Sequence, residues 1–310
     1  MATGGDAVGQ PAREDTTGPD AAMPPAGAGA GFGPTWVGAR ALAGGKGYAP
    51  CPMGQMHYRS IGAGAATPVL LIHQTPVGLA EFVDVQPALA RLGRRSIAPD
   101  SPGHGYSDPI RGDVTVGELA DNLAALCDQL GVARAVVAGH HTGAAIAASF
   151  AARNPARTAA LVLHGTPFYS PEERTSRLAR LASVPGITLK PDGSHFADIF
   201  QSSGTHAGID AQSLASLTWS ALGSLLAGPG LPIYRAVFSN DMGPTLAAIR
   251  APTLVLTDLK DVLHPNDRRV VEARPDFVLR EFSPGTSYTL MREPERWART
   301  VLEFASSVGS

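Results

Sequence analysis

Val137-Ala138-Gly139-His140-His141-Thr142-Gly143 is the stretch that decides the fold, because it joins an apolar run at residues 135–138 to a helical pattern at residues 142–153. Two glycines four residues apart at such a junction are typical of a sharp turn between a strand and a helix. A turn of this kind presents its central side chain at the end of a sheet. In this chain the central residue is His141.

Short apolar runs alternate with helical patterns on both sides of this turn. The runs suited to buried parallel strands are residues 69–72, 96–98, 135–138, 159–163, 253–257 and 277–282. Apolar residues recur at helical spacing over about 116–130, 142–153 and 293–306. Because alternating strands and helices bury a parallel sheet, the pattern predicts an α/β fold with a mostly parallel central sheet and helices on both faces.

The 310 residues divide into four parts. Residues 1–34 are rich in Gly, Pro and Ala and carry almost no large apolar side chain, which predicts a disordered N-terminal tail. Residues 35–166 and 247–310 hold the alternating pattern and are predicted to form the two halves of the core. Residues 167–246 contain helical patches at about 171–182 and 213–226 but no strong strand, so we expect a helical lid inserted into the core.

The composition argues against several classes of partner. The net charge is −2 and no basic stripe is present, so we expect no nucleic-acid partner. No apolar stretch is long enough for a membrane span and charged residues interrupt the N-terminus, so we expect a cytoplasmic protein without membrane contact. Neither a metal-ligand spacing of histidines nor a glycine-rich phosphate loop occurs, which predicts no metal and no cofactor. The oligomeric state is left open by these features.

Three further segments, each at the end of a predicted strand, belong together with the glycine turn. Ile72-His73-Gln74-Thr75-Pro76 ends the first predicted strand, residues 98–108 (APDSPGHGYSD) end the second, and residues 256–261 (LTDLKD) end a late one. With the glycine turn, their order and spacing resemble the α/β-hydrolase superfamily over about residues 50–310. In this resemblance the first segment corresponds to the oxyanion loop, the last to the loop that presents the catalytic acid, and the glycine turn to the nucleophile elbow.

The resemblance implies roles for five residues near the elbow. Backbone N–H groups of Thr75 and Thr142 would form an oxyanion hole, to which the amide of Gln74 could add a donor. His73 begins the oxyanion loop, and His164 ends the strand that follows the elbow helix. We therefore expect both histidines at the substrate-binding side of the site.

The elbow departs from the superfamily pattern. His141 stands where the pattern has Ser, Cys or Asp, and Ser287 stands where the pattern has the catalytic histidine, counted back from the last helix. The two residues are therefore predicted to be exchanged, with Asp261 as the acid. Asp258 is the nearest alternative to Asp261, and His264 is an alternative base.

A histidine at the elbow suits proton transfer. The positive end of the helix that follows disfavours the imidazolium of His141, so we expect a neutral imidazole that accepts a proton at neutral pH. A base beside an oxyanion hole, without a serine alkoxide, favours elimination over hydrolysis through an acyl-enzyme.

We therefore expect a cofactor-free, lyase-type enzyme that removes a small carboxylic acid, such as acetate, from a hydrophobic carbonyl- or acyl-bearing metabolite. The resemblance implies this activity, because the superfamily includes non-hydrolytic members of tetronate polyketide pathways. The composition, rich in Ala, Gly and Arg, suits bacterial natural-product biosynthesis. An ester or C–C bond hydrolase, in which His141 activates water or forms a transient acyl-imidazole, is the first alternative. A non-catalytic ligand-binding protein is the second.

Removal of residues 1–34 tests the tail. A chain that starts near Thr35 is expected to fold and to turn over substrate as the full chain does, because the removed segment cannot form a core. The melting temperature and the activity of the two chains are the measurements. A large loss of either on truncation would show that the tail docks on the rest of the chain.

Overall fold

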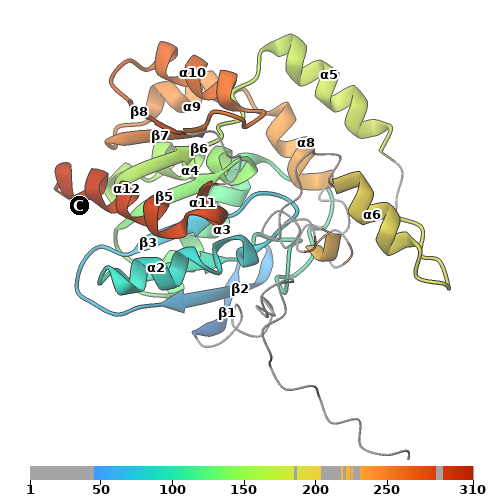
Figure 1. Ribbon diagram of the computed structural model, residues 1–310, viewed down its shortest axis with the longest axis horizontal. Helices are drawn as coiled ribbons and strands as arrows, with labels where there is room; N and C mark the ends of the chain where they lie inside the picture. Colours follow the sequence, from blue (N-terminus) through green and yellow to red (C-terminus); the bar gives the residue numbers. More distant parts are fainter. Residues whose placement is uncertain are drawn as a thin grey trace, which may run out of the picture. The chain divides into compact units, whose positions relative to one another are not determined.

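Figure 1 shows the computed structural model, which describes residues 45–184, 187–203, 231–283 and 289–309, with a few positions between 218 and 225. These residues belong to one compact unit, Trp36–Ser310, whereas the expected tail, residues 1–34, lies outside the described residues. Within the described ranges no helix is long and apolar enough to cross a membrane.

An eight-stranded sheet forms the centre of this unit, with the strand order β1-β2-β4-β3-β5-β6-β7-β8. Strands β1 and β2 pair antiparallel, as do β2 and β4, and the remaining neighbours pair parallel. The strands are β1 (Lys46–Cys51), β2 (Gly54–Ile61), β3 (Val69–Ile72), β4 (Ser96–Pro99), β5 (Ala135–His140), β6 (Thr158–His164), β7 (Thr253–Asp258) and β8 (Val278–Phe282).

The central strands β3 to β7 are buried along their whole length and mostly apolar, because both faces of the sheet are covered. In β3, Val69 and Leu71 belong to one buried cluster, whereas Leu70 and Ile72 belong to another. Side chains alternate between the two faces of a strand, so each face needs its own apolar set. This explains why continuous apolar runs, rather than alternating ones, mark the parallel strands.

Helices cover both faces. The cluster on one face contains side chains from α3 (Val116–Gln129), α4 (Thr142–Arg153), α8 (Leu231–Ser239), α9 (Met242–Ala248) and α10 (His264–Ala273). The cluster on the other face contains side chains from the short helix η1 (Leu79–Phe82) and from α2 (Val85–Arg91), α11 (Thr289–Arg292) and α12 (Pro294–Ser307). Helix α12 lies beside α2 (Figure 1).

Local signals in the sequence set the ends of several helices. The side chain of Thr115 accepts a hydrogen bond from the N–H of Glu118, and the Glu118 side chain bonds back to the N–H of Thr115, which caps α3. Pro294 occupies the first turn of α12, where its missing N–H costs little. Ser170 and Glu173 form the same reciprocal pair of hydrogen bonds and cap α5 (Pro171–Ala182).

Between β6 and β7 the described residues include the helices α5, α6 (His195–Ser203), α8 and α9. The expected helical patch at 213–226 lies largely outside the described residues. Side chains of α8 and α9 are part of the core cluster beside α4, among them Ile233, Val237, Met242 and Leu246. Helices α8 and α9 of the expected lid therefore pack on the core, and the lid itself stays a prediction.

The mostly parallel sheet with helices on both faces is confirmed. The hairpin of β1 and β2 is an addition that the apolar runs do not predict. Its strands carry Gly, Pro, Gln, His and Arg among their apolar residues, because β1 lies at the edge of the sheet and is largely exposed. A partly exposed strand does not need apolar residues on both faces, so its sequence shows no continuous apolar run.

Candidate active site

The elbow forms a strained turn between β5 and α4. Among the described residues, His141 is the one non-glycine residue with a positive φ, at 49°. A Cβ at Gly143 would lie 2.1 Å from the carbonyl oxygen of Ile72. A Cβ at Gly165 would lie 2.3 Å from Cδ2 of His141. Glycine is therefore required at both positions. Gly143 allows the close approach of the turn to Ile72, and Gly165 leaves room for the imidazole of His141.

Asp261 is the acid that reaches the elbow. Its Oδ2 lies 2.7 Å from Nε2 of His141, and its Oδ1 accepts a hydrogen bond of 2.7 Å from the N–H of Leu263. The Asp261 side chain is 2% exposed and that of His141 is 15% exposed, so solvent reaches the imidazole more than the acid. The alternative acid, Asp258, contacts His164 instead, at 3.2 Å.

The contact with Asp261 reverses the expected electrostatics of His141. Burial disfavours the imidazolium, but the charge of Asp261 and its hydrogen bond outweigh burial, so the pKa of His141 is raised above 6.5. The expectation of a lowered pKa, which rested on the dipole of α4, is therefore wrong. Burial acts to raise the pKa of Asp261, yet the charge and the hydrogen bond of His141 hold it below its usual range.

The same contact fixes the tautomer of the neutral imidazole. Ionised Asp261 is an acceptor only, so Nε2 of His141 must carry the proton of the 2.7 Å hydrogen bond. The lone pair that can accept a second proton is then at Nδ1. The contact thus has the geometry of a base and a group that orients it.

The oxyanion loop is tied to the elbow by two threonines. The N–H of Thr75 donates to Oγ1 of Thr142 over 2.8 Å, and this hydroxyl donates to Oγ1 of Thr75 over 3.1 Å. Tyr234, on α8, donates to the carbonyl oxygen of Thr75 over 2.8 Å. The expected donor at Thr75 is thus occupied by the hydroxyl of Thr142, which a substrate oxygen would have to replace.

His73 and His164 have both ring nitrogens engaged by the protein. Nε2 of His73 accepts from the N–H of Ser101, so Nδ1 donates to the carbonyl oxygen of Gln74. Nδ1 of His164 accepts from the indole N–H of Trp297, so Nε2 donates to Asp258. These contacts favour positioning roles for the two histidines over the substrate contact expected from the sequence.

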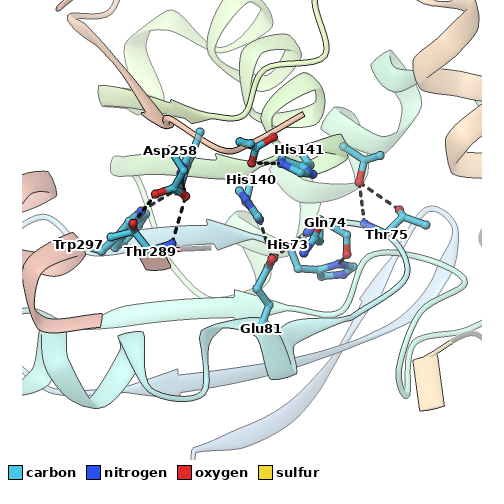
Figure 2. Close-up of polar contacts among 12 residues, drawn as sticks. His73, Gln74, Thr75, Glu81, His140, His141, Asp258, Thr289 and Trp297 are labelled. Carbon is cyan, nitrogen blue, oxygen red and sulfur yellow. Dashed lines mark hydrogen bonds and ion pairs between the residues drawn. The ribbon is translucent and has the colours of Figure 1, made fainter. Parts of the chain in front are cut away.

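Glu81, which the sequence analysis does not single out, lies below His140 in Figure 2, with its carboxylate toward that ring. Its Oε1 is 2.6 Å from Nδ1 of His140, and its Oε2 accepts from the N–H of Gln74 over 2.8 Å. The ring of His140 is in turn 4.2 Å from that of His141, measured between centroids. A lone acid within the apolar stretch Leu79-Ala80-Glu81-Phe82-Val83 is the signal that marks this residue.

Within the described ranges, one group of His, Cys, Asp and Glu side chains could share a metal ion. It consists of His140, His141 and Asp261, whose ligand atoms lie within 4.8 Å of one another. The spacing of histidines does not predict this group, because the fold brings Asp261 to the elbow from a distant part of the chain. In this group His141 is hydrogen-bonded to Asp261, and His140 is hydrogen-bonded to Glu81. We therefore describe it as a cluster of acids paired with imidazoles.

Of the two remaining residues of the sequence-based hypothesis, the structure describes His264 but not Ser287. Ser287 lies outside the described residues, so its place beside His141 stays a prediction. His264, the alternative base, contacts Glu281 at 3.0 Å at the start of α10. Among the described residues, the predicted base and acid that lie in contact are therefore His141 and Asp261, and their roles stay a prediction.

Comparison with known proteins agrees with this architecture. The family described as alpha/beta hydrolase fold matches residues 67–194. A 2-hydroxy-6-oxononadienedioate/2-hydroxy-6-oxononatrienedioate hydrolase from Pseudomonas putida is 32% identical over 277 residues, which cover 81% of this chain and 91% of that protein. A hydrolase of the same name from Paraburkholderia xenovorans is 30% identical over 269 residues, with 81% and 90% covered.

Solved structures share the fold. The enol-lactonase from Burkholderia xenovorans matches with a TM-score of 0.70 at 21% identity, over 84% of this chain and 100% of that chain. A thermophilic esterase from Thermogutta terrifontis matches with a TM-score of 0.65 at 24% identity, over 86% and 99%. With the relatives above, these findings show that the chain belongs to the α/β-hydrolase fold family.

Thr142→Val tests whether the hydroxyl of Thr142 occupies the oxyanion position. The variant keeps the shape of the side chain but leaves the N–H of Thr75 without its acceptor, so amide exchange of Thr75 is expected to accelerate by about tenfold. Exchange measured by NMR on both proteins is the test, with Thr142→Ser as the control that keeps the hydroxyl. Equal protection of the Thr75 amide in all three proteins would contradict the contact.

Proposed function

We propose that this protein is a hydrolase in which His141, oriented by Asp261, activates water against a carbonyl group of its substrate. The observation that carries the proposal is the 2.7 Å contact between Nε2 of His141 and Oδ2 of Asp261 at a nucleophile elbow that lacks serine, cysteine and aspartate. A histidine paired in this way is a general base. The named hydrolases among the relatives favour hydrolysis over the elimination expected from the sequence.

Water would be the nucleophile of the reaction. Nδ1 of His141 takes a proton from water while the oxygen attacks the carbonyl carbon, and the C=O electron pair moves onto the carbonyl oxygen. Collapse of this tetrahedral oxyanion reforms the C=O and breaks the bond to the leaving group. The imidazolium returns its proton to that group, so the products are a carboxylic acid and the protonated leaving group.

Backbone and side-chain groups close to His141 support this sequence of steps. Asp261 stabilises the imidazolium that forms at His141. The N–H groups of Thr75 and Thr142 are our candidates for the oxyanion hole, where one donor is typically worth about 3–4 kcal/mol. Gln74 is buried in the same loop and is a candidate for a further donor. Ser287 stays a candidate partner of His141.

The substrate we propose is an unsaturated oxo acid or an ester. The named relatives are hydrolases of 2-hydroxy-6-oxononadienedioate, a compound with a ketone. Attack of water on a ketone can release a carboxylic acid only by breaking a C–C bond, and the conjugated fragment that leaves is a stabilised carbanion. An ester would release an alcohol by the same steps. A small carbonyl-bearing metabolite is thus the proposed partner.

Turnover in water labelled with 18O separates hydrolysis from the alternatives. The probes are 2-hydroxy-6-oxononadienedioate and a nitrophenyl ester, and mass spectrometry of the acid product is expected to show one 18O from water. His141→Ala is expected to lose at least about 10²-fold in kcat while it keeps its fold. An unlabelled acid with an alkene would indicate elimination, and an unchanged probe would indicate a binding protein. Wild-type rates in a folded His141→Ala variant would refute the mechanism.

The pH profile of the rate tests the charge state of His141. The base must be unprotonated, so kcat/KM is expected to fall as pH falls through the pKa of His141, which Asp261 raises above 6.5. Asp261→Asn removes the charge that raises this pKa, so the acid limb is expected to move to lower pH while kcat decreases. A limb that stays in place in the folded variant would show that another group controls the profile.

A further inference from the structure

A second acid–imidazole pair lies directly behind the first. Glu81 and His140 are both buried, with side chains 0% and 1% exposed, and their contact is 2.6 Å long. The rings of His141, His140 and His164 follow one another, with centroids 4.2 Å and then 4.7 Å apart. Neither Glu81 nor His140 takes part in the proposed hydrolysis, so their burial at this place needs a separate explanation.

The two carboxylate oxygens of Glu81 reach the two halves of the site. Oε1 contacts His140, which precedes the elbow residue on β5, and Oε2 accepts from the N–H of Gln74 in the oxyanion loop. The carboxyl group therefore bridges the strand that carries the base and the loop that carries the oxyanion donors. Figure 2 shows Glu81 below His140 and beside His73.

Burial of a carboxyl group at such a bridge costs free energy when the group is ionised. Glutamine has the same shape, and its amide could accept from Gln74 and donate to His140 without the cost of burying a charge. Burial raises the pKa of Glu81 to about 7, although the N–H of Gln74 and the neighbouring imidazoles act in the opposite direction. The negative charge also stabilises an imidazolium at His141. An acid thus adds an electrostatic effect that an amide cannot provide.

We propose that Glu81 is a positioning residue of the active site, which holds the elbow and the oxyanion loop in one arrangement through its two carboxylate oxygens and favours protonation of His141 by its charge. This role deepens the proposed function and rests on it, because His141 is the base whose position and charge are controlled. The other ionisable groups around the pair are His73, His164, Asp258 and Asp261.

Two substitutions separate the bridge from the charge. Glu81→Leu removes both contacts, so the Gln74 amide is expected to lose its protection from exchange, and kcat on 2-hydroxy-6-oxononadienedioate or a nitrophenyl ester is expected to fall about 10²-fold. Glu81→Gln keeps both contacts without the charge. It is expected to keep the protection of Gln74 and kcat within about tenfold, with the acid limb of kcat/KM moved to lower pH.

Gln86→Leu is the matched control. Gln86 is a buried polar residue of α2 whose side chain donates to the carbonyl oxygens of Arg59 and Ser96, over 3.1 and 3.4 Å, and it touches neither the elbow nor the oxyanion loop. Its loss is expected to lower the melting temperature but to leave the Gln74 amide protected and the pH profile unchanged.

The outcomes that overturn the role of Glu81 differ from those that overturn the proposed function. A folded Glu81→Leu variant with full protection of the Gln74 amide refutes the bridge, whatever the reaction is. If that variant does not fold, an unmoved acid limb in Glu81→Gln refutes the electrostatic part. Activity that survives His141→Ala refutes the proposed function. The exchange of the Gln74 amide still tests whether Glu81 bridges the elbow and the oxyanion loop.

Discussion

Gly139, Gly143 and Gly165 leave no room for a side chain near His141, and the rest of the site depends on this crowding. A Cβ at Gly139 would lie 2.2 Å from the carbonyl oxygen of Gly143, and one at Gly143 would lie 2.1 Å from that of Ile72. The chain can turn between β5 and α4 only with glycines there, and the turn places His141 in its unusual backbone conformation. The ring then meets Asp261 without an intermediate residue.

Three imidazoles and three carboxyl groups share this buried corner, and each acid has an imidazole of its own. Asp261 contacts His141, Glu81 contacts His140, and Asp258 contacts His164. Removal of one partner from such a pair leaves a charge in a medium of low polarity, which is far more costly than the pair itself is favourable. Each of the three pairs therefore depends on both of its members.

The sequence predicted the sheet and the base–acid pair because both leave local marks. Continuous apolar runs mark the buried strands, and His141 and Asp261 stand at set distances from glycines and strand ends. Glu81 leaves no motif, since its partner His140 is 59 positions away. The raised pKa of His141 could not be predicted either, because it depends on a distance to Asp261 that an argument from the helix dipole does not contain.

The hydrogen bond from Tyr234 to the carbonyl oxygen of Thr75 connects α8 to the catalytic loops. Thr142 holds the same residue from the elbow side, so Thr75 is clamped between two elements that are far apart in sequence. A substitution in α8 that displaces Tyr234 is therefore expected to release Thr75 on one side, although α8 belongs neither to the elbow nor to the loop that carries Thr75.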